Sequence, residues 1–172
     1  VFMGNLIKKA RSLDNTRLVA AALEVEREGY TVTVEDPLGE LIYIASFNEY
    51  VGWYLSEPKE LQKYNFVIQY DKPVIMSEFG GGALAGFHAD DDTVWSEEFQ
   101  ELLYKNQIEM LEKIDGLRGM TPWILVDFKS PRRQHPVYQN FWNRKGLISE
   151  TGQKKKAFFV LQKYYKEKSM NK

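Results

Sequence analysis

The sequence contains no cysteine, which excludes disulfide bonds and thiolate chemistry. It has only two histidines, His88 and His135, and no group of His, Asp and Glu has metal-ligand spacing, so we assign no metal and no cofactor. An excess of one charge is also lacking, because 23 Lys and Arg face 24 Asp and Glu. That balance indicates neither a nucleic-acid nor a membrane surface. No stretch approaches the ~20 apolar residues of a membrane span.

What is present is an ordinary globular composition. The chain has 172 residues, of which 44% are hydrophobic and 27% charged, which predicts one domain with a real core. The amino terminus, "VFMGNLIKKARSL", reads as helix interior rather than signal peptide, with Leu6, Ile7, Ala10 and Leu13 on one face. Because the chain opens inside a helix and without Met, we expect it to be a piece of a longer protein. The compartment stays open, cytoplasmic or periplasmic.

Short apolar runs alternate with helical patterns along the chain. The apolar runs predict strands at 18–23, 41–47, 72–77 and 120–128. Helices are expected from Pro58, after Ser96 as N-cap, and over 154–168, the last with a basic outer face. Wholly apolar strands that alternate with helices indicate a parallel sheet covered by helices.

Two architectures fit such a sheet: an open doubly wound sheet, or part of a (βα)8 barrel. The unusual segments "NEYVGWY", "EFGGG" and "DFKSPRRQHP" all follow predicted strands, where barrel enzymes keep their chemistry. A nucleotide-binding open sheet has no support, because no G-x-G-x-x-G or Walker loop is present. A full barrel needs about 250 residues and eight strands. We therefore expect an α/β fold, a partial TIM barrel of about four parallel βα units.

The stretch "VIMSEFGGG" places Glu78 at the exit of the third predicted strand. A carboxylate there would suit nucleophilic attack on the anomeric carbon of a sugar. The three glycines that follow would let the backbone approach a ligand closely. On its own, the same pattern also fits a strand-end Glu in an ordinary Gly-rich loop.

The longer stretch "KPVIMSEFGGGALAGFH" resembles the nucleophile segment of the family-two glycoside hydrolases, which include β-glucuronidases and β-galactosidases. The similarity continues through "NEYVGWY", "TPWILVDF" and "WNRKGLISETGQKKKAFFVLQKYY", so it covers nearly the whole chain. The resemblance implies a TIM barrel preceded by β-sandwich domains, and retaining hydrolysis. Residues 1–172 would be the carboxyl-terminal half of the catalytic barrel, strands five to eight.

The resemblance implies that Glu78 is the nucleophile. In the family the acid/base is the Glu of an Asn-Glu pair on barrel strand four, which we expect to lie upstream of this chain. Asn48-Glu49 lies on the segment that matches strand six, so we expect Glu49 to be a loop carboxylate in an ion pair, with the acid/base role as the alternative. The isolated chain should then be inactive.

Further substrate contacts carry over from the resemblance. Asn48, Tyr50 and Tyr54 match strand-six contacts, with aromatic packing at the barrel rim as the alternative for the tyrosines. Trp123 is expected on strand eight, either as the floor of the sugar site or as core.

The motif "NRKG" carries the sugar preference that the resemblance implies. Asn143 and Lys145 match an Asn-x-Lys pair that binds the sugar carboxylate, and an ammonium with an amide suits a carboxylate. The alternative is a solvated basic loop, and Asp127 is expected to be a structural hydrogen-bonding residue.

Three functions follow as hypotheses. The first is part of a β-glucuronidase-like hydrolase; the second is a β-galactosidase or related exo-acting β-glycosidase. The third, from another class, is a non-catalytic sugar-binding module. The partner is expected to be a carbohydrate, a β-glucuronide or a β-galactoside, and not nucleic acid or membrane. Open sheet edges also predict that the isolated chain self-associates, and the parent protein is expected to be a homo-oligomer.

Overall fold

The computed structural model describes residues 1–170, which form two compact units. The first, called the sheet unit, comprises residues 1–49, 62–79 and 110–121. The second, called the helix unit, comprises residues 50–61, 80–109 and 122–170.

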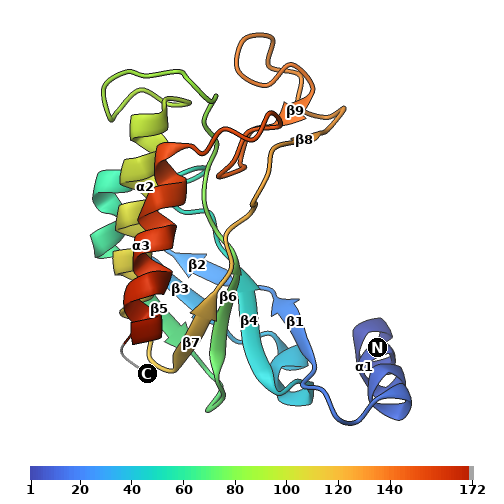
Figure 1. Cartoon of the computed structure of the whole chain (residues 1–172). Helices are drawn as coiled ribbons and strands as arrows, with labels where there is room; N and C mark the ends of the chain where they lie inside the picture. The colour runs from blue at the N-terminus through green and yellow to red at the C-terminus, as the bar shows by residue number, and fades with distance from the viewer. Residues whose placement is uncertain (171–172) are drawn as a thin grey trace. The chain divides into compact units, whose positions relative to one another are not determined.

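The sheet unit contains a four-stranded sheet in the order β1-β4-β6-β7, and all its pairings are parallel (Figure 1). The strands follow one another across the sheet in chain order, as in a barrel, whereas a doubly wound sheet reverses direction. This confirms the expected parallel sheet. The strands are β1 (Ala20–Leu23), β4 (Ile44–Asn48), β6 (Val74–Glu78) and β7 (Leu117–Met120).

One face of this sheet forms the core of the unit. Side chains alternate between the faces of a strand, and the register places Leu23, Phe47 and Met76 on the same face, each at most 4% exposed. The Phe47 ring packs against Phe66, with ring centroids 5.8 Å apart. The next row along the strands, on the opposite face, carries Ala22, Ser46, Ile75 and Gly119, of which all but Ile75 are small.

A second sheet lies where one helical connection was expected. The helix expected from Pro58 is wrong: a 3-10 turn, η2 (Pro58–Lys63), is followed by the strand β5 (Asn65–Ile68). This strand pairs in parallel with β3 (Thr31–Val34), which pairs antiparallel with β2 (Glu26–Glu28). Of the three connections between sheet strands, only the one from β6 to β7 contains an α-helix. The four parallel strands agree with the expected partial α/β barrel, and the connections between them are mixed rather than uniformly helical.

The fourth strand lies earlier than expected. It covers Leu117–Met120 rather than 120–128, and residues 121–127 are irregular. Thr121 marks the exit from the sheet, because its backbone N–H donates to Met76 O (2.8 Å) and its hydroxyl to Ser77 O (2.6 Å). Leu125, further along the chain, is 55% exposed, so the apolar run at 120–128 does not form the buried strand that we expected.

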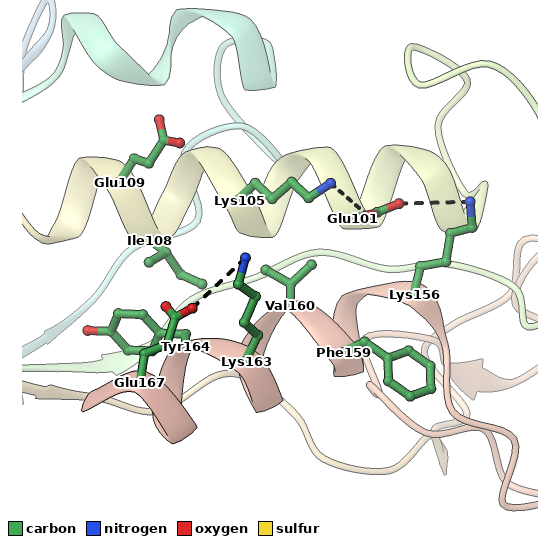
Figure 2. Close-up of a pocket in the computed structure, with 10 residues that line it drawn as sticks. All are labelled: Glu101, Lys105, Ile108, Glu109, Lys156, Phe159, Val160, Lys163, Tyr164 and Glu167. Carbon is green, nitrogen blue, oxygen red and sulfur yellow. Dashed lines mark hydrogen bonds and ion pairs between the residues drawn. The ribbon is translucent and has the colours of Figure 1, made fainter. Parts of the chain in front are cut away.

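The helix unit contains two helices that lie side by side (Figure 1), α2 (Glu97–Leu111) and α3 (Lys156–Met170). The last two residues of α2 belong to the sheet unit. Ser96 is the N-cap of α2, as expected, because its hydroxyl accepts from the N–H of Phe99 at 2.9 Å. Figure 2 shows the groove between α2 and α3, where charged side chains such as Glu101 and Lys105, 2.7 Å apart, line the rim. The unit also contains the short ribbon of β8 (Phe128–Lys129) and β9 (Trp142–Asn143).

The first helix forms as expected, but its apolar face is largely uncovered. Helix α1 spans Phe2–Leu13, and of its apolar face only Ile7 is buried, whereas Leu6 is 47% and Leu13 74% exposed. Arg11 fastens the helix to the turn η1 (Pro37–Leu41) through a 2.6 Å bond to Leu41 O. Over residues 1–170, no helix combines the length and apolar character needed to cross a membrane.

Candidate active site

The carboxyl ends of β4 and β6 bring Asn48 and Glu78 together. Each is the last residue of its strand, and the two are register partners in the parallel sheet. The register shifts between Phe47 and Asn48, so a local irregularity falls at the strand end. Beyond it, the N–H of Glu49 donates to the carbonyl of Glu78 at 2.9 Å. The backbone itself thus sets the position of Glu78.

Ser77 fixes this strand end from the side. Its hydroxyl lies 2.7 Å from Asn48 Oδ1 and 3.0 Å from the carbonyl of Phe47. The carbonyl of Ser77 accepts from the Thr121 hydroxyl at 2.6 Å. The end of β4 and the residue that follows β7 therefore both help to hold the exit of β6.

Glu49 is buried in an ion pair, as expected. It is 3% exposed, and its Oε2 accepts from Arg27 Nε at 2.8 Å and from Nη2 at 2.7 Å. The pair ties the segment after β4 to β2. This carboxylate serves the structure of the sheet unit.

The glycine loop that follows β6 is packed against side chains. A Cβ at Gly81 would lie 2.4 Å from Leu103 Cδ2 and 2.7 Å from Trp53 Cε3. The loop is held further by Gln100, whose Nε2 donates to Gly81 O at 2.8 Å. Gly81 is therefore explained by the lack of space for a side chain within the helix unit, whereas the sequence predicted that the glycines let the backbone approach a ligand.

Lys145 lies in a cluster of aromatic side chains in the helix unit. It is 5% exposed, and its Nζ lies 3.9 Å from the ring centroid of Tyr50 and 4.2 Å from that of Tyr54. Such cation–π contacts strengthen when the cation is desolvated. The ammonium also donates to the Tyr54 hydroxyl at 2.7 Å.

The ammonium changes the acidity of Tyr54. Partial burial alone would raise the pKa of this hydroxyl, but the hydrogen bond from Lys145 and the charges of Lys145 and Arg133 outweigh it, so the pKa lies below its ordinary value. Tyr54 is 56% exposed, so it reaches from the buried lysine to the surface.

Asn143 belongs to the same cluster, whereas Trp123 departs from expectation. Asn143 ends β9, is 5% exposed, and its Oδ1 accepts from the N–H of Lys145 at 3.1 Å. Trp123 is half-buried in the irregular segment after β7 and not on a strand, with its ring 6.2 Å from that of Phe128. Its neighbour Ile124 is bonded to the cluster, because the Ile124 N–H donates to Lys145 O at 3.1 Å. The segment 143–146 is buried, so it is not a solvated basic loop.

A buried ion cluster beneath this segment was not found from the sequence. Lys155, expected on a basic outer helix face, is 0% exposed and lies 2.9 Å from Asp127 Oδ1. Arg144 contacts both Asp127 (3.3 Å) and Glu150. Burial raises the pKa of Asp127 and lowers that of Lys155, and the attraction between the two charges opposes both shifts. The expected structural role of Asp127 is confirmed. The burial of Lys155 could not be predicted, because nothing in the sequence "KKK" (154–156) distinguishes its middle lysine from the other two.

The remaining features add no further site. Among the described residues no three His, Asp or Glu side chains gather as they would around a metal ion. The groove between α2 and α3 is lined by none of the candidate residues (Figure 2).

A parallel sheet in sequential strand order, with a carboxylate and an amide at its carboxyl edge, defines a domain of the α/β-barrel class. The family model "Glycosyl hydrolases family 2, TIM barrel domain" matches residues 2–170. The chain therefore belongs to glycosyl hydrolase family 2.

Relatives and solved structures agree with this family. The chain is 27% identical to a β-glucuronidase of Paenibacillus borealis over 88% of its own length and 27% of the relative's. It is 30% identical to the β-glucuronidase of Canis lupus familiaris over 95% of its own length and 25% of the relative's. The β-glucuronidase of an uncultured Clostridium sp. has the same fold, with a TM-score of 0.77 at 22% identity over 96% of this chain and 29% of that one. The chain thus spans about a quarter of the curated relatives it matches.

Proposed function

We propose that residues 1–172 are the carboxyl-terminal half of the catalytic barrel of a retaining β-glycosidase, with Glu78 as nucleophile. The observation that carries this proposal is the position of Glu78, which ends β6 beside Asn48 at the carboxyl edge of a parallel sheet in a family 2 chain.

Self-association of the chain, expected from the outer edges of β1 and β7, stays a prediction.

The reaction runs in two steps. The Glu78 carboxylate attacks the anomeric carbon, forms a glycosyl ester, and the aglycone leaves with a proton from a second carboxyl group. The same second group then removes a proton from water, which attacks the anomeric carbon and releases Glu78. We assign no residue of this chain to the second role, because Glu49 is engaged by Arg27. We therefore expect the 172-residue chain alone to be inactive.

The preferred substrate in this proposal is a β-glucuronide. Lys145 is a buried cation whose ammonium donates to the Tyr54 hydroxyl, and Asn143 Oδ1 accepts from its backbone N–H. An ammonium in a partly dehydrated, aromatic environment favours a carboxylate at C6 of the sugar over a neutral hydroxymethyl group. The names of the curated relatives support the same preference.

The sugar preference can be tested with a longer protein that carries this chain, using matched aryl β-glucuronide, β-glucoside and β-galactoside. We expect the glucuronide to be hydrolysed best. Lys145→Ala should lower its kcat/KM by roughly 10- to 150-fold, as loss of a charge-assisted contact of about 1.5–3 kcal/mol implies, and should change the other sugars far less. Lys154→Ala, at an exposed lysine nearby, is the control.

Two results would contradict this assignment. Equal losses on all three sugars would reduce Lys145 to a supporting role, and a preference for the galactoside would favour the β-galactosidase alternative. Sugar binding without any hydrolysis would instead support the non-catalytic module.

A further inference from the structure

Lys155 contacts the backbone of the segment that carries Lys145. Its ammonium lies 3.0 Å from the carbonyl of Arg144, the peptide group that directly precedes Lys145. The other contacts are the carbonyl of Ala83 at 2.7 Å and the Asp127 oxygens at 2.9 Å and 3.0 Å. Three N–H donors of a fully buried lysine are thus satisfied.

Asp127 holds the other side of the same residue. Its Oδ1 accepts from the N–H of Gly146, directly after Lys145, at 2.8 Å. The Lys155–Asp127 pair therefore contacts the peptide group on each side of Lys145. The backbone groups of Lys145 itself are held by Asn143 Oδ1 and the Ile124 N–H.

Gly146 is required for this approach. A Cβ there would lie 2.3 Å from the backbone nitrogen of Asp127 and 2.4 Å from its Oδ1. A buried ion pair is costly to desolvate and seldom adds net stability. Because the Lys155–Asp127 pair is fully hydrogen-bonded, we take its role to be fixing one conformation of the backbone around it.

We propose that the Lys155–Asp127 pair is a positioning device that sets the location of Lys145 and thereby the recognition of the sugar carboxylate. This inference rests on the proposed function, in which Lys145 contacts that carboxylate. Lys155 and Asp127 are positioning residues, since they act through the backbone of residues 144–146.

The physical consequence is specific to one substrate group. A displacement of about 1 Å can cost on the order of 100-fold when a group must meet its partner in a fixed geometry. If the pair sets only the location of Lys145, its removal weakens binding of a carboxylate-bearing sugar. It leaves the same sugar without the carboxylate unaffected.

The test uses the double variant Asp127→Asn/Lys155→Met in the longer protein, which removes both charges and so leaves no unpaired buried ion. We expect KM for the aryl β-glucuronide to rise roughly 10- to 100-fold, with kcat and the kinetics of the aryl β-glucoside little changed. Hydrogen exchange should show faster exchange at residues 143–147 and unchanged protection in α2. Lys156→Met, at the next lysine, which contacts Glu98 instead, is the matched control.

Parallel losses on both sugars, or an unchanged KM for the glucuronide, would overturn the inference. Failure of the proposed function looks different, because the unmodified protein would then show no preference for the glucuronide and no response to Lys145→Ala. Even then, unchanged hydrogen exchange at residues 143–147 in the double variant would overturn the positioning role of the pair. If α2 also loses protection in the double variant, Lys155→Arg takes its place, since a planar guanidinium keeps the charge but not the contact geometry.

Discussion

The exit of β6 and the segment 143–147 hold their chemical groups in different ways. Glu78 is placed by strand pairing and by short bonds around Ser77. Lys145 lies on irregular chain that is held by buried ions from distant positions, Asp127 and Lys155. The Glu78 side chain can therefore be replaced with little effect on the backbone around it. The position of Lys145 depends instead on both Asp127 and Lys155.

The largest expected effect comes from Glu78, the carboxylate that ends β6. In the longer protein, Glu78→Gln should lower kcat by roughly 10⁴-fold or more, as removal of a nucleophile does, with the fold intact because the backbone sets the position. Glu49→Gln should leave most of the activity, since Glu49 pairs with Arg27. A slow 2-fluoro glycosyl substrate should label Glu78, as mass spectrometry of the peptide can show. Loss of activity in Glu49→Gln with folding preserved would reverse the two roles.

The second prediction concerns stability in the helix unit. Lys155→Met alone leaves Asp127 buried without its main counterion and should cost about 3–5 kcal/mol of unfolding free energy. Asp127→Asn/Lys155→Met should recover much of this loss. Urea unfolding of both variants, with Lys156→Met as control, measures the difference. If the double variant is no more stable than the single one, the buried pair is not the cause.

The smallest expected effect concerns a partly exposed carboxylate at the start of α2. Burial raises the pKa of Glu98, but hydrogen bonds from Lys156, His88 and the Ala89 N–H outweigh it and lower the pKa from 4.5 to about 2. A lowered folded-state pKa stabilises the protein fully above about pH 4.5, and this contribution is lost as the pH falls from 4.5 through 2.

Glu98→Gln should therefore cost roughly 0.5–1 kcal/mol near pH 7, and the difference should shrink below pH 4.5 and disappear only below about pH 2. Thermal unfolding of both forms across this range tests it. A difference independent of pH would show that charge is not responsible. Glu167→Gln, in a looser pair with Lys163 at 3.9 Å, provides the comparison.

Local patterns predicted the elements whose burial is regular. The runs at 18–23, 41–47 and 72–77 became β1, β4 and β6 with shifts of a few residues, and Ser96 caps α2 as expected. These signals depend on residues close in sequence, so a single sequence contains them.

The errors arose where distant contacts decide the structure. The segment 65–68 pairs with β3, some 30 residues earlier, so its β-branched residues form a strand rather than continue a helix. The apolar run at 120–128 is bonded to the end of β6 only at its start, through Thr121, and then continues as irregular chain. Likewise Lys155 is buried because Asp127 lies opposite it, 28 positions away.

In the candidate site, the sequence placed Asn48 and Glu78 at strand ends and grouped Asn143 with Lys145. The structure brings each pair together. The cluster around Lys145 with Tyr50 and Tyr54 joins positions about 90 residues apart, which only the resemblance to a family could suggest.

The lack of space at Gly146 limits how the protein can be engineered. A loop taken from a relative and inserted over residues 143–147 would keep its geometry only if Asp127 and Lys155 were transferred with it, because both contact the backbone of that loop. A change of sugar preference by loop exchange therefore has to move a set of residues scattered over 29 positions, from 127 to 155, as one module.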